Sequence, residues 1–98
     1  MIRIKIYDKE YPYLPTMGAM LAFKEETGIE VTDVSPADSL LNAKFAYFVV
    51  KYACLHTREE AFGLSFEEFC SGLSTDEYYR VVAETLQAGQ KQIDAGEK

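Results

Sequence analysis

Apolar residues recur through residues 39–58 in a pattern that predicts a helix at the centre of the fold. The stretch contains neither proline nor glycine and is too long for one strand. At about 100° per residue, one broad side of this helix is apolar and comprises Leu41, Phe45, Phe48, Val49, Tyr52, Ala53 and Leu55. Apolar residues also occupy most of the remaining surface, and only Lys44, Lys51 and Arg58 form a narrow polar line. A helix that is apolar nearly all round is buried by its neighbours, so we expect the other elements to cover it.

The amino-terminal residues alternate between apolar and other side chains. Ile2, Ile4 and Ile6 recur with period two, which predicts a half-buried strand whose isoleucines face inward. Residues 8–10 are expected to form a turn, followed by a short return strand. Pro12 lacks an amide donor, so the return strand should be an edge or irregular strand. These features predict a β-hairpin over residues 1–14, which needs helices to lean on.

Capping residues predict the bounds of the first two helices. Thr16 is suited to cap a helix over residues 16–27, and Gly28 is suited to end it in the left-handed conformation. The Ser-Pro pair at 35–36 offers a cap followed by a proline at the first helical position. The central helix is therefore predicted over residues 36–58.

Two Ser-x-x-Glu capping boxes start the remaining helices. The box at Ser65 predicts a helix over residues 65–72, and the box at Ser74 predicts one over residues 75–92. On the last helix the apolar residues share one face, namely Tyr79, Val82, Leu86 and Ile93. The polar end of the chain predicts fraying after Ala88.

Composition limits the fold and function classes. The 98 residues, 48% of them apolar, predict a single globular domain over residues 1–98, mainly helical α+β in class. The net charge of −6 disfavours nonspecific binding to nucleic acid or to an anionic membrane surface. The amino terminus enters a strand directly and the central helix carries internal lysines, so we expect neither a signal peptide nor a membrane span. Two cysteines within helical patterns predict free thiols in a reducing, cytoplasmic compartment.

Candidate catalytic and metal-binding groups do not assemble in the sequence. Cys54 and His56 are two residues apart, so on a helix their side chains diverge by about 160° and do not pair. Adjacent carboxylates such as Glu67 and Glu68 diverge similarly and are typical of a helix start. We therefore predict no catalytic residue, no cofactor and no metal site. A small metal-binding protein or enzyme remains the third alternative.

Seven tyrosines and six phenylalanines are the most distinctive feature of the composition. They either fill a small core with their hydroxyls reaching water, or form a protein-binding surface. Under the second interpretation three tyrosines lie together on the outer face of the hairpin, and two begin the last helix. The candidate protein-binding residues are Tyr7, Tyr11, Tyr13, Met17, Met20, Tyr78 and Tyr79. An open sheet edge beside the hairpin tyrosines would also favour a homo-oligomer.

The order of these parts resembles the tail assembly chaperones of long-tailed bacteriophages and prophages. The resemblance lies in the Ile-Arg-Ile-Lys-Ile strand at 2–6, the Phe-Lys-Glu-Glu-Thr-Gly helix end at 23–28, the aromatic-rich middle helix and the Leu-Ser-Phe-Glu-Glu-Phe segment at 64–69. It implies a non-enzymatic protein of the bacterial host cytoplasm. Such a protein covers the apolar helices of the tape-measure protein and brings in the tail-tube protein. The alternative is a regulatory or adaptor protein-interaction module of a mobile element.

Overall fold

The computed structural model describes the backbone of residues 1–58 and 61–97, and the side chains of these residues up to residue 87. A small antiparallel hairpin precedes four helices, which confirms the predicted mainly helical α+β fold. The elements are β1 (Arg3–Ile6), β2 (Lys9–Pro12), α1 (Met17–Thr27), the 3-10 turn η1 (Val31–Asp33), α2 (Ser39–Thr57), α3 (Phe66–Gly72) and α4 (Thr75–Glu97).

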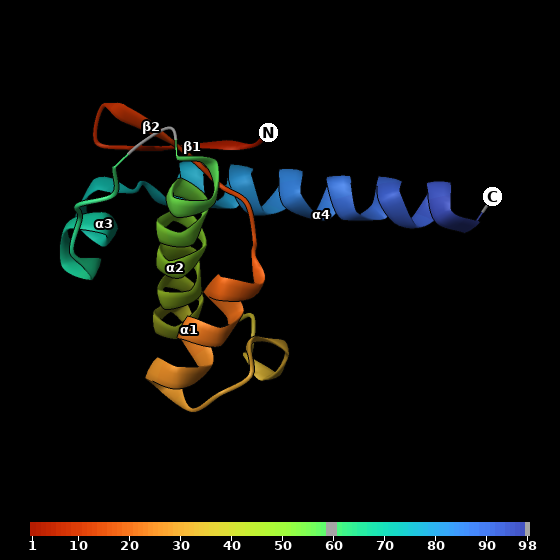
Figure 1. Ribbon diagram of the computed structural model, residues 1–98, viewed down its shortest axis with the longest axis horizontal. Helices are drawn as coiled ribbons and strands as arrows, with labels where there is room; N and C mark the ends of the chain where they lie inside the picture. The colour runs from red at the N-terminus through yellow and green to blue at the C-terminus, as the bar shows by residue number, and fades with distance from the viewer. Residues whose placement is uncertain (59–60, 98) are drawn as a thin grey trace.

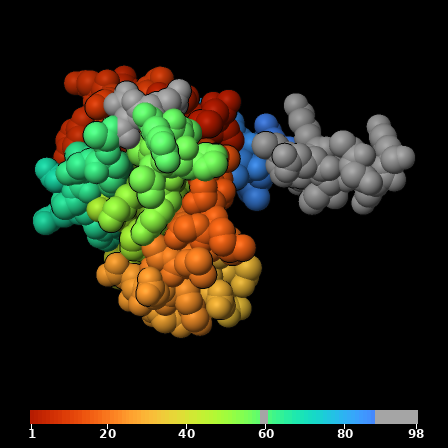
Figure 2. Space-filling view, viewed as in Figure 1, coloured from red at the N-terminus to blue at the C-terminus, as the bar shows by residue number. Residues whose placement is uncertain are grey.

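Helix α2 forms the centre of the fold, as its apolar pattern predicts. It packs against α1, α3 and β2 (Figure 1), and the hairpin and α1 lie at opposite ends of the body (Figure 2). Its buried residues are Ala46, Phe48, Val49, Val50, Ala53 and Cys54. The prediction is wrong for Leu55, which is 68% exposed. Leu55 lies one turn after Lys51 and therefore shares the solvent-facing side of that lysine.

The predicted start of the central helix is corrected by three residues. Helix α2 begins at Ser39, with the Asp38 carboxylate accepting a hydrogen bond from Leu41 N at 3.0 Å. Ser35 instead stabilises the turn before it, because its hydroxyl accepts from Ala37 N and its carbonyl accepts from Asp38 N. Of the two candidate caps, the carboxylate is thus the one placed at the helix start.

The caps of α1 and α3 are confirmed. The Thr16 hydroxyl accepts a hydrogen bond from Ala19 N, and Gly28 ends α1 with φ of 74°. At α3 the box is reciprocal, because Ser65 accepts from Glu68 N while the Glu68 carboxylate accepts from Ser65 N.

Helix α4 is longer than predicted. Its backbone is helical through Glu97, five residues beyond the expected end at residue 92. The Gln, Lys, Ala and Glu residues of 87–97 favour helix, which offsets the two glycines of that range. The helix, about 34 Å long, packs against β1 and projects beyond the rest of the domain (Figure 1). The predicted position of Ile93 on the apolar face lies outside the residues whose side chains are described.

The hairpin is tighter than predicted. Its register pairs Ile6 with Lys9, so the loop comprises only Tyr7 and Asp8, and the expected turn at 8–10 is wrong. Ile4 and Ile6 face inward and are buried, as their alternation predicts.

The expected outer face of tyrosines is wrong for Tyr11 and Tyr13, which are each only 6% exposed. Ile4 pairs with Tyr11, and cross-strand partners point to the same face of a sheet, so Tyr11 joins the isoleucines in the core. Tyr13 N donates to Ile2 O at 2.9 Å, which extends the same register and turns Tyr13 inward too.

Candidate partner-binding groove

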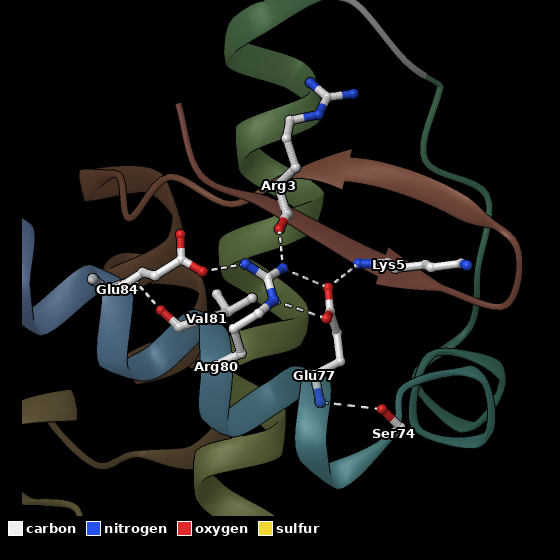
Figure 3. Close-up of polar contacts among 8 residues, drawn as sticks. Arg3, Lys5, Ser74, Glu77, Arg80, Val81 and Glu84 are labelled. Carbon is white, nitrogen blue, oxygen red and sulfur yellow. Dashed lines mark hydrogen bonds and ion pairs between the residues drawn. The ribbon is translucent and has the colours of Figure 1, made fainter.

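Two side chains of α4 attach this helix to the free edge of β1 (Figure 3). Lys5 N donates to Glu77 Oε2 at 2.7 Å, and Arg80 Nη2 donates to Arg3 O at 2.7 Å. Arg80 Nε also donates to Glu77 Oε1 at 3.0 Å, and Arg80 pairs with Glu84. On the edge of β1 that faces away from β2, Lys5 N and Arg3 O are therefore satisfied by side chains instead of by a third strand.

The second predicted capping box is only half formed, because the Glu77 carboxylate is engaged at the edge of β1. Ser74 Oγ accepts from Glu77 N at 3.1 Å, as predicted. The Glu77 carboxylate does not complete the box but binds Arg80 and Lys5 N. Its hydrogen bond with Arg80, and then that with Lys5 N, hold the pKa of Glu77 below its ordinary value of 4.5. A charge-assisted contact thus docks α4 on the hairpin.

Because α4 docks on the hairpin, a groove of about 390 Å³ lies between α4 and the helices α2 and α3. The turn before α2 contributes Pro36, and the start of α2 contributes Ser39, Asn42 and Ala43. The end of α3 and the residue after it contribute Phe69, Cys70 and Leu73. The start of α4 contributes Ser74, Thr75, Tyr78, Tyr79 and Val82.

None of the described residues that line this groove carries a charge, although 27% of the chain is charged. Burial raises the pKa of Tyr78 above its ordinary value, so this ring stays neutral and apolar in character. Burial likewise raises the pKa of the Cys70 thiol, which keeps that group protonated at neutral pH. The groove is therefore a neutral, largely apolar surface.

An exposed apolar face of α4 continues the groove along the helix. Tyr79 is 67% exposed and Leu86 is 64% exposed, with half-buried Val82 between them. Spacings of three and four residues place all three side chains on one side of the helix, as the sequence predicts. We call this row of Tyr79, Val82 and Leu86 the α4 stripe. Groove and stripe together form a surface suited to a helix with one apolar side.

The seven candidate residues fall into separate places. Tyr78 and Tyr79 line the groove, whereas Tyr11 and Tyr13 belong to the core. Tyr7 is exposed on the hairpin loop. Met17 and Met20 are exposed on α1 beside Leu21 and form a second apolar row, separate from the groove.

Sequence reasoning missed several groove residues. The spacing of Val82 and Leu86 was visible as the apolar face of the last helix, although neither was named as a binding residue. For Cys70 and Leu73 no sequence signal was available, because their place depends on how the end of α3 meets α2 and α4.

A second hollow runs between the hairpin and α4. Its charged lining residues are Arg3, Lys5, Glu10, Glu77, Arg80 and Glu84, three of each sign. Several of these groups already bind one another or the β1 backbone, as Figure 3 shows. Charged groups of this hollow are therefore engaged within the chain, and the uncharged, largely apolar groove is the stronger candidate site for an apolar partner.

The two cysteines differ in their surroundings. Cys54 is buried in α2, whereas Cys70 is exposed, and neither forms a disulfide. In the part of the chain that the structure describes, no three His, Cys, Asp or Glu side chains gather as metal ligands would. Nor does any described helix combine the length and apolar character needed to cross a membrane.

Comparison with known proteins gives no relative. No protein-family model, no curated protein and no solved structure matches the chain.

Proposed function

We propose that this protein is a non-enzymatic tail assembly chaperone that binds an apolar helix of a tape-measure protein in the groove. The observation that carries the proposal is the uncharged groove, continued by the exposed α4 stripe. The resemblance in the order of hairpin, helix ends and middle helix supports the choice of phage partner. We place the activity in the cytoplasm of the bacterial host.

The energetics suit a reversible helix-in-groove contact. Fully covering an exposed Tyr or Leu side chain contributes roughly 1.5–3 kcal/mol each. The cost of association and of ordering side chains offsets much of that gain. A groove of about 390 Å³ and a stripe two turns long therefore favour a transient complex, which suits a partner that must later be released.

The exposed row on α1 supports the second half of the proposed role. Met17, Met20 and Leu21 form an apolar surface separate from the groove. Methionine adapts its shape to different partners. Two separate surfaces would let one domain hold the tape-measure protein and contact the tail-tube protein or another copy of itself.

Co-expression with the tape-measure and tail-tube proteins of the same genome tests the proposal. We expect the tape-measure protein to become soluble and to co-purify, and Leu86→Ser to reduce its recovery severalfold. Leu55→Ser is the matched control, because Leu55 is similarly exposed at 68% but lies on α2, outside the groove. A tape-measure protein that stays insoluble beside the folded wild-type domain would reject the chaperone role. Recovery of a transcriptional regulator from prophage-induced cells would favour the adaptor alternative.

A further inference from the structure

We infer that the groove selects its partner helix by charge: it takes an uncharged helix face and favours Lys or Arg on the flanks of that face. The inference rests on the proposed function and names the chemistry of its partner. It follows from two observations, the neutral floor of the groove and the acidic residues around it.

The floor cannot compensate a charge that enters the groove. Its lining has no charged side chain among the described residues. Two of its polar side chains are already engaged within the chain. Asn42 Nδ2 donates to Ser35 O at 2.9 Å and to Asp38 O at 2.7 Å, and Ser74 Oγ accepts from Glu77 N. A Lys or Glu on the inserted face would therefore lose water without meeting an opposite charge in the lining.

The rim of the groove is acidic. Asp38 directly precedes Ser39, and its carboxylate caps α2. Glu67 lies one turn before Cys70 on α3, and Asp76 directly follows Thr75 on α4, both exposed. The nearest basic residue of α2, Lys44, has its Nζ 5.8 Å from the centroid of the Phe66 ring, which holds it over α3. Three carboxylates thus adjoin lining residues, one just before α2, one on α3 and one on α4, against the single lysine Lys44.

Basic flanks on a bound helix match this arrangement. Lys and Arg lay their aliphatic stems on apolar surface while their charged heads reach polar groups beyond it. Along the groove those heads would meet the carboxylates of the rim. Exposed ion pairs add little affinity individually but act on association rate and on the choice between partners. The net charge of −6 acts in the same direction and repels acidic helices.

Cys70 offers a direct measurement of groove occupancy. It lines the groove and is exposed, whereas Cys54 is buried, so a small disulfide reagent added to the folded protein modifies Cys70 first. A helix that fills the groove slows this reaction. The probes are three synthetic helices of about 20 residues with the same Leu/Ala face and with Lys, Gln or Glu flanks. A fourth peptide carries one Lys on the apolar face.

We expect the Lys-flanked helix to protect Cys70 at a concentration roughly threefold to tenfold lower than the Gln-flanked helix at low salt, with the Glu-flanked helix weakest. The difference should shrink at about 0.5 M salt. The double variant Glu67→Gln, Asp76→Asn should lose the preference for Lys flanks but keep protection. Glu25→Gln on α1, an exposed carboxylate outside the groove, is the control that should keep the preference.

The outcomes separate this inference from the proposed function. Equal protection by the three flank variants overturns charge selection but leaves a helix-binding groove. Protection by the face-Lys peptide as strong as that by the Gln-flanked one overturns the requirement for a neutral face. No protection by any peptide overturns the inference altogether. If the tape-measure protein still co-purifies in that case, the chaperone role stands and uses another surface.

Discussion

The ring of Tyr7 occupies the space that a β-carbon on Gly72 would need. A β-carbon built at Gly72 would lie 2.5 Å from Tyr7 Cδ2, and Tyr7 N donates to Gly72 O at 2.8 Å. Tyr7 has φ of 57°, which the two-residue loop of the hairpin requires. The hairpin loop is therefore held against the last residue of α3, next to the groove.

Gly72→Ala should destabilise the protein by roughly 1–3 kcal/mol, because the tyrosine ring has to leave its place. The sign of this change in stability is informative, because replacing glycine by alanine within a helix otherwise stabilises the protein by about 1 kcal/mol. Chemical denaturation measures the effect. Gly63→Ala is the control, because a β-carbon there meets nothing within 4 Å. Equal stability of the Gly72→Ala protein and the wild type would contradict the contact.

Phe48→Ala should cost roughly 3–5 kcal/mol of the free energy of unfolding, because Phe48 is buried on α2. Leu55→Ala on the same helix should cost less than about 1 kcal/mol, because Leu55 is exposed. Thermal and urea unfolding of both variants compare the two sides of the helix. A similar loss of stability in both variants would show that the side of α2 that carries Leu55 is covered in solution.

Glu77→Gln should lower stability at neutral pH by about 1 kcal/mol, through weaker bonds to Arg80 and Lys5 N. The folded-state pKa of Glu77 lies below 4.5, so its contribution is present above pH 4.5 and is lost as pH falls through the folded value. The stability difference between wild type and variant should therefore shrink in acid. Urea midpoints measured from pH 7 down to about pH 3 test this, and a pH-independent difference would oppose it.

Tyr13→Phe should make the protein more resistant to alkali. Burial, and then the charge of Tyr78, raise the pKa of Tyr13 to about 12. A raised pKa means that stability is complete below the ordinary value of 10.0 and is lost as pH rises through 12. The free energy of unfolding should fall less between these pH values in Tyr13→Phe than in the wild type. Tyr79→Phe is the control, because Tyr79 is exposed. If the stability of the wild type and of Tyr13→Phe fell equally at alkaline pH, a group other than Tyr13 would be responsible for the fall.

Removing both side chains that cover β1, in Glu77→Ala with Arg80→Ala, should increase self-association. The backbone groups of Lys5 and Arg3 would then be free to pair with another strand. Sedimentation velocity at high concentration measures this, and circular dichroism checks that the variant is folded. Glu84→Ala, which removes a partner of Arg80 but no contact to β1, is the control. A variant that sediments like wild type would show that the covered edge does not limit association.

The homo-oligomer expected from the sequence stays a prediction, but the structure changes where to look for it. The edge of β1 is covered by α4, and β2 contains Pro12, which donates no backbone hydrogen bond. The exposed row of α1 and the α4 stripe are better candidates than the sheet edge.

Local signals in the sequence predict most elements of this protein. Thr16 and Gly28 mark the two ends of α1 through hydrogen bonds within one turn, and the Ser65 capping box marks the start of α3 in the same way. The alternation of isoleucines selected the inner face of β1. The apolar surface of residues 39–58 selected the central helix.

The place of α4, and hence the existence of the groove, depends on contacts between residues that are distant in sequence. Its attachment depends on Glu77 bonding Lys5 N, 72 residues away, instead of completing its own capping box. Either the backbone N–H of Ser74 or that of Lys5 could bond the Glu77 carboxylate, so the local sequence pattern does not choose between them. The inward turn of Tyr11 likewise depends on its register opposite Ile4, which a shift of one residue would reverse. Contacts between residues distant in sequence made these choices, and those contacts form only when the hairpin, α3 and α4 pack together.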